Sequence, residues 1–554
     1  MRSKPGELNN FPAATRWTAV QSGRYSAWCL GELLSYAGPA TGTEARLRQV
    51  LADLESNTLD YARLNGRFVL IFRDEQAQEW TFVTDRVGAL HCYAVWHGER
   101  IVALGSDLAG LARRVSARKL DWEAITTFFS FGFFLDNRTY FTNIRVLNPR
   151  SLYRIGAMGD LHQHVCYWQW QHHVDRNRTY DETIEMYDAL LHQAVQRCTT
   201  EERAVLPISG GLDSRSLVSV LPRDSAVETY SYGYSTDSIE TNIAAQIADA
   251  RQLEFTRHVI SPYLFKRLPE LVLALHGCQD VTQARQMSVN EWVKAHGSVV
   301  LTGLWGDVWC DQMGLADGLP QDLTVLAHTV KKFQKNGRAW LQENISTPQL
   351  ENRDISQFLT SQIEAGLAEF DHIEDLDFRV KAYKTSCWSF RWSNASLRGF
   401  EVGATPRIAY YDVGLIDFFC TVPTAFIRDR RLQIDHLKRY APDLARVYWQ
   451  EAGANLYRAK YGYWLSLPRR AIRKAIRQVK HQRPVQRNWE VQFLSPEGQN
   501  GLRYWLLRPG LKLHDVVEPQ AVESLLSAFY AQPNGANGYT VSILLTFSAW
   551  LETV

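Results

Sequence analysis

Hydrophobic and polar positions alternate along much of the first 165 residues, a pattern that is typical of β-strands. Three runs show it most clearly, at residues 67–74, 80–87 and 100–107, and polar turns separate them. We therefore predict a β-rich N-terminal region, arranged as a meander of strands with few helices.

From about Tyr180 the pattern changes to short apolar runs that alternate with segments of helical spacing. The predicted strands are 204–208, 229–234 and 298–303, and the predicted helices are 181–195, 214–221 and 241–252. Strands that alternate with helices favour a parallel sheet with helices on both faces. Residues 320–400 are expected to be mostly helical and polar.

The composition is that of a folded protein with more than one domain. The 554 residues are too many for a single hydrophobic core, and 45% of them are hydrophobic. The 61 basic and 59 acidic residues give a net charge of +2, which argues against general nucleic-acid binding. No run of about 18 apolar residues is present, so we expect no membrane span. The eight cysteines are scattered without a CxxC pair, and MRSKPGELNN lacks a signal-peptide core, so we expect a cytoplasmic protein.

The sharpest chemical signal is the sequence SGGLDS, which follows a predicted buried strand and precedes a predicted helix. Gly210 and Gly211 let the backbone approach an anion closely, and the helix directs free N–H groups at that anion. Ser209 and Ser214 add hydroxyl donors. Asp213 suits a phosphate site if a cation lies between the two, which implies Mg²⁺. A glycine turn without a ligand is the alternative interpretation.

SGGLDS resembles the pyrophosphate loop of the asparagine synthetase family, which includes β-lactam synthetases and lasso-peptide cyclases. Those enzymes split ATP between the α and β phosphates and leave AMP on the substrate. The resemblance covers nearly the whole chain. It implies an Ntn-hydrolase-like αββα sandwich, followed by a parallel-sheet PP-loop ATPase domain of the adenine-nucleotide α-hydrolase-like type. The implied boundaries are 1–165 for a degenerate glutaminase-like domain, 166–182 for a linker, 183–495 for the synthetase domain and 496–554 for a C-terminal helical extension.

The segment LTGLWGDVW resembles the family's motif SGxGADE at the end of the third strand. The matching positions are Thr302, Gly303, Gly306 and Asp307. Trp305 stands where the motif has a glycine, and Val308 replaces its glutamate. The resemblance implies that Asp307 is the second Mg²⁺ ligand beside Asp213; a turn residue without a ligand is the alternative.

Three other segments extend the resemblance. TYSYGY is similar to the strand whose end holds adenine and ribose, with Ser231 and Gly233 at the matching positions, although a plain core strand fits the pattern too. PRIAYYD resembles the family's RxPFLD segment, and RAKYGYW resembles its RxKxGF motif. The last match makes Lys460 the candidate that binds phosphate oxygens and stabilises charge in the transition state. A solvated surface lysine is the alternative.

The N-terminal region resembles the family's glutaminase domain in GELLSY, TGTEA, RLNGRFVLIFRD and TDRVGALHCYAV. In that fold the nucleophile is a cysteine exposed as the first residue after removal of methionine. Here Arg2 and Ser3 follow Met1, and the nearest thiol is Cys29. We therefore expect no release of ammonia from glutamine, and a structural or partner-binding role for this domain.

Two positions depart from the family in the half of the site that handles the amine. Leu304 stands where relatives have Glu or Tyr, and Thr405 stands where many have Glu. Glu401 lies one helical turn earlier and is a possible replacement. These departures disfavour ordinary asparagine synthesis.

The resemblance and its departures leave three functions to compare. The first is an ATP-dependent amide ligase that acts without glutamine on a small-molecule or peptide substrate, with lasso-peptide cyclisation as its most specific form. Its expected partners are a precursor peptide or a leader-binding protein. The second is an ammonia-dependent asparagine synthetase. The third is a nucleotide-binding scaffold without catalysis, which has no need of the two carboxylates Asp213 and Asp307.

Two other segments suggest binding but have simpler interpretations. The basic stretch 468–483 could contact an anionic membrane or an acidic peptide, or form an ordinary surface helix. The histidine-rich stretch 162–173 resembles the family's junction between domains more than a metal site.

Overall fold

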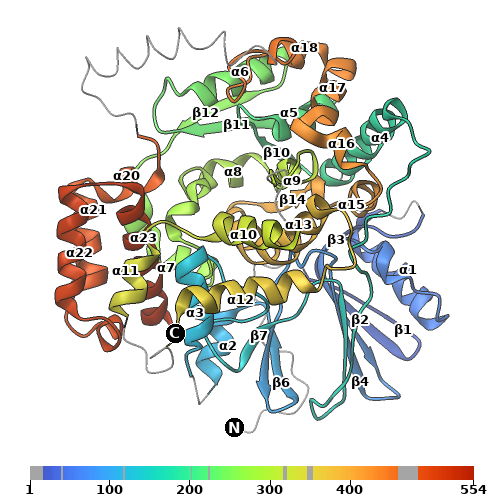
Figure 1. The fold of residues 1–554 in the computed structure, drawn as a ribbon. Helices are drawn as coiled ribbons and strands as arrows, with labels where there is room; N and C mark the ends of the chain where they lie inside the picture. Colours follow the sequence, from blue (N-terminus) through green and yellow to red (C-terminus); the bar gives the residue numbers. More distant parts are fainter. Residues whose placement is uncertain are drawn as a thin grey trace.

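The computed structural model describes residues 17–38, 41–115, 119–200, 202–222, 225–315, 321–345, 353–459 and 485–554. Two antiparallel sheets form the N-terminal part, and a parallel sheet with helices around it follows (Figure 1). Met1, Arg2, Ser3, Lys460 and the basic stretch 468–483 lie outside the described residues.

The larger antiparallel sheet has six strands in the order β1-β2-β3-β4-β8-β9. Their bounds are β1 Trp17–Ser22, β2 Tyr25–Ser35, β3 Asn65–Asp74, β4 Glu79–Thr84, β8 Ser151–Ile155 and β9 Leu161–Cys166. A three-stranded sheet has the order β6-β5-β7, with β5 Tyr93–His97, β6 Arg100–Gly105 and β7 Ile144–Val146. The predicted meander therefore holds for β1 to β4 and is wrong beyond them, because β5 to β7 leave to form the second sheet.

The two sheets and their helices form four layers, as the αββα expectation requires. Helix α1 (Gly42–Glu55) packs Leu47 and Val50 on one face of the larger sheet, in a cluster with Leu70. The other face of that sheet shares a core with the smaller sheet. Helices α2 (Leu108–Arg114) and α3 (Trp122–Phe131) cover the remaining face of the smaller sheet, in a cluster that includes Tyr93. The inner strands β2 and β3 thus bury both of their faces, which explains their runs of apolar residues, whereas the edge strands β1 and β9 are largely exposed.

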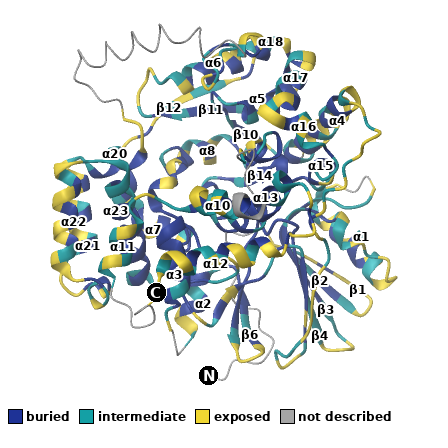
Figure 2. Ribbon diagram, viewed as in Figure 1, coloured by how far each residue is buried: buried dark blue, intermediate teal, exposed yellow. Residues whose placement is uncertain are grey.

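The parallel sheet has the order β12-β11-β10-β13-β14, and neighbouring strands run parallel. The strands are β10 Ala204–Pro207, β11 Glu228–Gly233, β12 Phe255–Val259, β13 Val299–Thr302 and β14 Thr405–Ile408. The predicted strands at 204–208, 229–234 and 298–303 are confirmed as β10, β11 and β13. The predicted helices are confirmed as α4 (Tyr180–Thr199), α5 (Leu212–Ser219) and α6 (Ile239–Ala250). The central strands are buried beneath these helices (Figure 2).

The rest of the described chain is mostly helical, as predicted for 320–400. The helices from α7 onward that bear on the site are α9 Gly306–Trp309, α13 Leu376–Lys384, α14 Asn394–Glu401 and α17 Arg431–Tyr440. Between α13 and α14 the residues Thr385–Ser393 form a π-helix. Helices α20 Asn488–Phe493, α21 Pro496–Leu507, α22 Pro519–Ala531 and α23 Gly535–Thr553 gather with α7 (Leu264–Ala274) at one side of the molecule (Figure 1).

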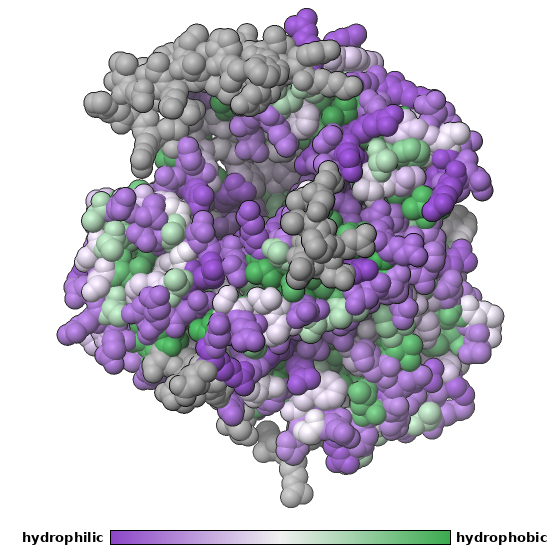
Figure 3. All heavy atoms as spheres, in the orientation of Figure 1, coloured by the Kyte–Doolittle hydropathy of each residue, from purple (hydrophilic) through white to green (hydrophobic). Residues whose placement is uncertain are grey.

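The surface of the face drawn in Figure 3 is largely hydrophilic, with small hydrophobic patches between the polar residues. Among the helices of the described chain, none combines the length and the apolar character needed to cross a membrane.

Candidate functional site

The SGGLDS loop joins the carboxyl end of β10 to the start of α5, at the edge of the sheet where parallel strands present ligand sites. Its own hydrogen bonds hold its shape. The Ser209 N–H donates to Ser214 Oγ at 3.0 Å, and the Gly211 N–H donates to Ser209 Oγ at 3.2 Å. The two hydroxyls, expected as donors to a phosphate, also lie 3.2 Å from each other. The loop is therefore preformed, with the N–H groups at the start of α5 at its open side.

A buried arginine that was not identified from the sequence fixes the back of the loop. Arg215 is fully buried, and burial lowers its pKa to about 10. Its guanidinium donates to the carbonyl of Tyr448 at 2.9 Å, to that of Val447 at 3.1 Å and to that of Gly210 at 3.4 Å. Carbonyl oxygens thus accept from both terminal nitrogens of the guanidinium, and the loop is bonded to the segment after α18 (Pro442–Arg446).

Asp213 and Asp307 come together at this edge because two glycines allow close packing. A Cβ on Gly303 would lie 2.9 Å from the Ser214 nitrogen, so β13 ends directly against the start of α5. A Cβ on Gly306 would lie 2.9 Å from the carboxyl carbon of Asp213, and Asp307 is the next residue. The structure therefore places Asp213 and Asp307, the two predicted Mg²⁺ ligands, close to each other.

The charges around Asp213 suit a cationic ligand. Burial raises the pKa of Asp213 to about 6, and the negative charge of Asp307 adds to that effect. The Arg430 guanidinium lies 3.2 Å from Asp213 Oδ1, and the Gln433 amide donates to the same oxygen at 3.2 Å; both oppose the rise. Arg430 also lies 3.6 Å from Asp311.

Arg430 and Gln433 were not found from the sequence. Arg430 precedes α17, and both Arg430 and Asp429 have positive φ, at 59° and 56°. Non-glycine residues in this conformation are strained and are enriched at functional sites. The only signal in the sequence was a run of charged residues, RDRR, without a motif around it.

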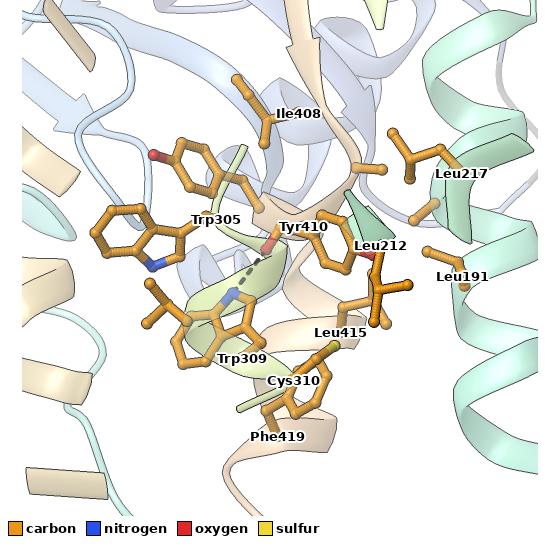
Figure 4. Packing of buried hydrophobic residues seen from close by; sticks show 14 of the residues in the cluster. Leu191, Leu212, Leu217, Trp305, Trp309, Cys310, Ile408, Tyr410, Leu415 and Phe419 are labelled. Atoms are coloured by element: carbon orange, nitrogen blue, oxygen red, sulfur yellow. Dashed lines mark hydrogen bonds between the residues drawn. The ribbon is translucent and has the colours of Figure 1, made fainter. Parts of the chain in front are cut away.

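An apolar cluster packs between the elements that carry the site (Figure 4). Leu212 and Leu217 of α5 pack with Trp309 and Tyr410, and the Trp309 indole N–H donates to the Tyr410 carbonyl at 3.1 Å. The Tyr410 hydroxyl accepts from the Gln433 amide at 3.5 Å, so this cluster also orients a partner of Asp213.

Ser231 and Gly233, the residues predicted to border adenine and ribose, lie on β11. Ser231 is buried near the end of β11, and Gly233 ends that strand. A Cβ on Gly233 would lie 2.7 Å from the Ser238 Cβ, so this position requires glycine. Both residues lie at the same edge of the sheet as the loop.

The positions that depart from the family separate in space. Leu304 follows the carboxyl end of β13, beside the site. Thr405 begins β14 and therefore lies at the opposite edge of the parallel sheet. Glu401 forms an ion pair with Arg67 of β3. Glu401 and Thr405 line a cavity of about 430 Å³ between the N-terminal sheets and the synthetase part, together with Glu32, Arg67 and Asp107.

The donor set fits Mg²⁺ bound together with phosphate. Two adjacent carboxylates are the hard oxygen ligands that Mg²⁺ uses, and substrate phosphates and water usually complete its shell. Thr302 Oγ1, buried at the end of β13, has no hydrogen-bond partner among the described residues and adds an oxygen at this edge. Clusters of three or more His, Cys, Asp or Glu that could hold a metal unaided are absent from the described residues.

Two thiols of the N-terminal sheets, Cys29 and Cys92, are buried, whereas Cys166 at the end of β9 is exposed. Cys29 of β2 and Cys92, the residue before β5, lie in hydrophobic clusters, and burial raises the pKa of both thiols, which disfavours the reactive thiolate. The described residues that line the cavity between the parts include no cysteine.

Comparison with known families agrees with this architecture. Residues 48–168 match a glutamine amidotransferase domain, and residues 186–319 match asparagine synthase. A search of curated proteins finds no match. The fold and the site thus define a PP-loop synthetase domain that follows an Ntn-like domain in the chain. The chain is an asparagine synthetase-family protein, in a family of ATP-dependent ligases that form amide bonds.

Proposed function

We propose that this protein adenylates a substrate carboxylate with release of pyrophosphate, and then joins the acyl group to an amine with release of AMP. The observation that supports this most directly is the meeting of Asp213, Asp307 and Arg430 beside the preformed SGGLDS loop. A scaffold that only bound nucleotide would not need two carboxylates held together at a cost in desolvation.

Each group has a role that follows from its chemistry. The loop N–H groups and Arg430 bind the β and γ phosphates of ATP, and Ser231 and Gly233 border the nucleoside. Asp213 and Asp307 would hold Mg²⁺, which neutralises charge on the phosphate oxygens when bound. Lys460, outside the described residues, is proposed to stabilise the charge that grows on the α-phosphate.

The bonds change in two steps. A carboxylate oxygen of the substrate attacks the α-phosphorus in line, and the bond to the bridging oxygen breaks to release pyrophosphate. The amine nitrogen then attacks the acyl carbon, AMP leaves with the bonding electron pair, and the amine proton passes to base or solvent.

We propose that the amine does not come from glutamine. The burial of the Cys29 and Cys92 thiols, whose raised pKa disfavours the thiolate, supports this. Leu304 and Thr405, which cannot serve as bases, further suggest that the amine belongs to a specialised substrate. A carboxylate and an amine on one peptide would give a macrolactam of the lasso-peptide type, since a bound intramolecular pair supplies a high effective concentration. A precursor peptide is then the partner.

ATP–pyrophosphate exchange tests the reaction type. The acids to be tried are L-aspartate, L-glutamate and synthetic peptides with a free N-terminal amine and an internal acidic residue. Exchange with one of them, lost in Asp213→Ala and kept in the surface variant Asp249→Ala, is the expected result. Release of phosphate in place of pyrophosphate would reject the mechanism.

A further inference from the structure

Lys384 is a buried lysine beside the adenylation site that the roles above do not use. It ends α13, and only 9% of it is exposed. Within the described part of the chain, its ammonium group contacts two indole rings, with Nζ 5.2 Å from the ring centre of Trp305 and 5.6 Å from that of Trp388. Both distances are within the range of a cation–π interaction. Among the described residues, no carboxylate forms an ion pair with Lys384.

The structure around Lys384 is unusual in two respects. Trp305 has a φ of 76°, a left-handed conformation that is costly for a bulky residue. Its indole N–H donates to Thr385 Oγ1 at 3.2 Å, which joins the loop before Asp307 to the first residue of the π-helix. π-Helices are rare and occur often at functional sites. Trp305 is thus held in a strained position in which its ring covers Lys384.

The charge of Lys384 is only partly compensated, by two indole rings and by the charge of Asp307, and it has no ion-pair partner among the described residues. Burial lowers its pKa to about 8, the negative charge of Asp307 opposes this, and Lys332 and Lys381 lower it further. The ammonium group is therefore still mostly protonated at neutral pH. A buried cation without a close anionic partner is unfavourable, so an anion from a ligand would relieve it.

We propose that Lys384 is a further substrate-binding residue, whose ammonium group holds the carboxylate of the acyl substrate. This inference rests on the proposed function. In the proposed function, the SGGLDS loop and Arg430 bind the phosphate groups on the Asp213 side of the site. Lys384 reaches the site from a different element, on the Trp305 side of Asp307. Two indole walls suit an organic acid, and by excluding water they strengthen a charge-assisted hydrogen bond to it.

The test uses the exchange assay with the acid that serves the wild-type protein. Lys384→Met keeps most of the side-chain volume and removes the charge. We expect the KM for the carboxylate to rise about 10- to 100-fold, while the KM for ATP changes less than about twofold. Lys384→Arg should restore part of the lost affinity, because it restores the cation.

Lys335 offers a matched control. Its Nζ lies 4.9 Å from the ring centre of the same Trp388, but the carboxylate that acts on it is Asp280 and not Asp307. Lys335→Met should leave both KM values unchanged. Thermal unfolding of each variant identifies any loss of folding, and if Lys384→Met does not fold, Lys384→Gln replaces it.

The outcomes separate the two hypotheses. An unchanged KM for the carboxylate, or an equal rise in both KM values, overturns the role of Lys384 and leaves the proposed reaction in place. If the wild-type protein exchanges pyrophosphate with none of the acids, the proposed function is rejected, and the inference about Lys384 is rejected with it.

Discussion

The Arg430 guanidinium lies 3.2 Å from the Asp213 carboxylate, at the rim of the parallel sheet where Asp307 contributes a second negative charge. In the protein without ligand, this arginine supplies part of the positive charge that the acidic pair requires. Because a guanidinium also binds phosphate oxygens in a forked geometry, the same residue can turn to the pyrophosphate group when nucleotide is bound.

Removal of Arg430 should therefore weaken the binding of pyrophosphate. We expect Arg430→Ala to raise the KM for pyrophosphate in the exchange reaction by about tenfold or more, since a hydrogen bond to a charged group is lost. The adjacent Arg431 is a suitable control, because its guanidinium lies over the ring of Tyr180. Equal effects of Arg430→Ala and Arg431→Ala would argue against this role.

The raised pKa of Asp213 predicts a pH-dependent cost in stability. The folded protein holds this proton up to about pH 6, whereas the ordinary value of the group is 3.8. The folded state therefore binds more protons than the unfolded state in this window, and the stability falls as the pH rises through it. Asp213→Asn should raise the free energy of unfolding at pH 7 to 8 by about 1 to 2 kcal/mol.

Urea unfolding at several pH values, without Mg²⁺, measures this difference. Most of the gain from Asp213→Asn should disappear near pH 4, because the wild-type carboxyl is then protonated in the folded state and close to half protonated in the unfolded state. A gain of the same size at pH 4 and pH 8 would show that charge is not its cause. The same variant should lose Mg²⁺-dependent binding of ATP, measured by calorimetry.

Gly303 should tolerate no side chain, because β13 and α5 touch there. A Cβ would lie 2.9 Å from the Ser214 nitrogen and 3.2 Å from the Asp213 carbonyl carbon, and both are backbone atoms. Gly303→Ala should destabilise the protein by about 1 to 3 kcal/mol and slow exchange by about tenfold or more, because α5 and Asp213 must move.

Gly98 provides the control for this prediction. It has a positive φ of 62° and no atom within 4 Å of an added Cβ, and asparagine tolerates that conformation. Gly98→Asn should leave the exchange activity unchanged. Normal activity in Gly303→Ala would mean that the start of α5 is less closely packed than the structure indicates.

The junction between the N-terminal sheet and the parallel sheet should depend on one buried ion pair. Arg407 of β14 bonds to Glu32 of β2 through Nε at 2.8 Å and Nη2 at 3.0 Å, and each side chain is only 7% exposed. Glu32→Ala leaves a buried guanidinium without its carboxylate, so we expect a loss of about 3 to 5 kcal/mol. The double variant with Arg407→Met should recover much of it.

An exposed ion pair serves as the reference in the same urea unfolding experiment. Arg100 and Asp160 lie 2.7 Å apart with 56% and 44% of their side chains exposed, and Asp160→Ala should cost less than about 1 kcal/mol. If the two single variants cost the same, burial does not govern the Glu32–Arg407 pair.

The N-terminal domain should not hydrolyse glutamine. We expect no glutamate above background in a coupled assay, and no change in Cys29→Ala, because that thiol is buried and its raised pKa disfavours the thiolate. Hydrolysis by the wild-type protein would reject the glutamine-independent mechanism.

Local patterns were sufficient for much of this protein. The apolar runs that became β10, β11 and β13 were recognisable because a buried parallel strand must be apolar on both faces. The loop from Ser209 to Ser214 was recognisable because glycines, hydroxyls and a carboxylate in that order have few other uses. The helices after Tyr180 were predictable because their apolar residues recur at helical spacing.

Contacts between distant segments were not accessible in this way. The departure of β5 to β7 into a second sheet, the approach of Arg430 to Asp213 and the enclosure of Lys384 by Trp305 and Trp388 all join residues far apart in the chain. No local pattern encodes them, because they arise when separately formed elements pack and bury their surfaces together. The amino-acid sequence thus determined the helices, the strands and the phosphate loop. The packing of the tertiary structure decided which charged and aromatic side chains lie around the proposed site.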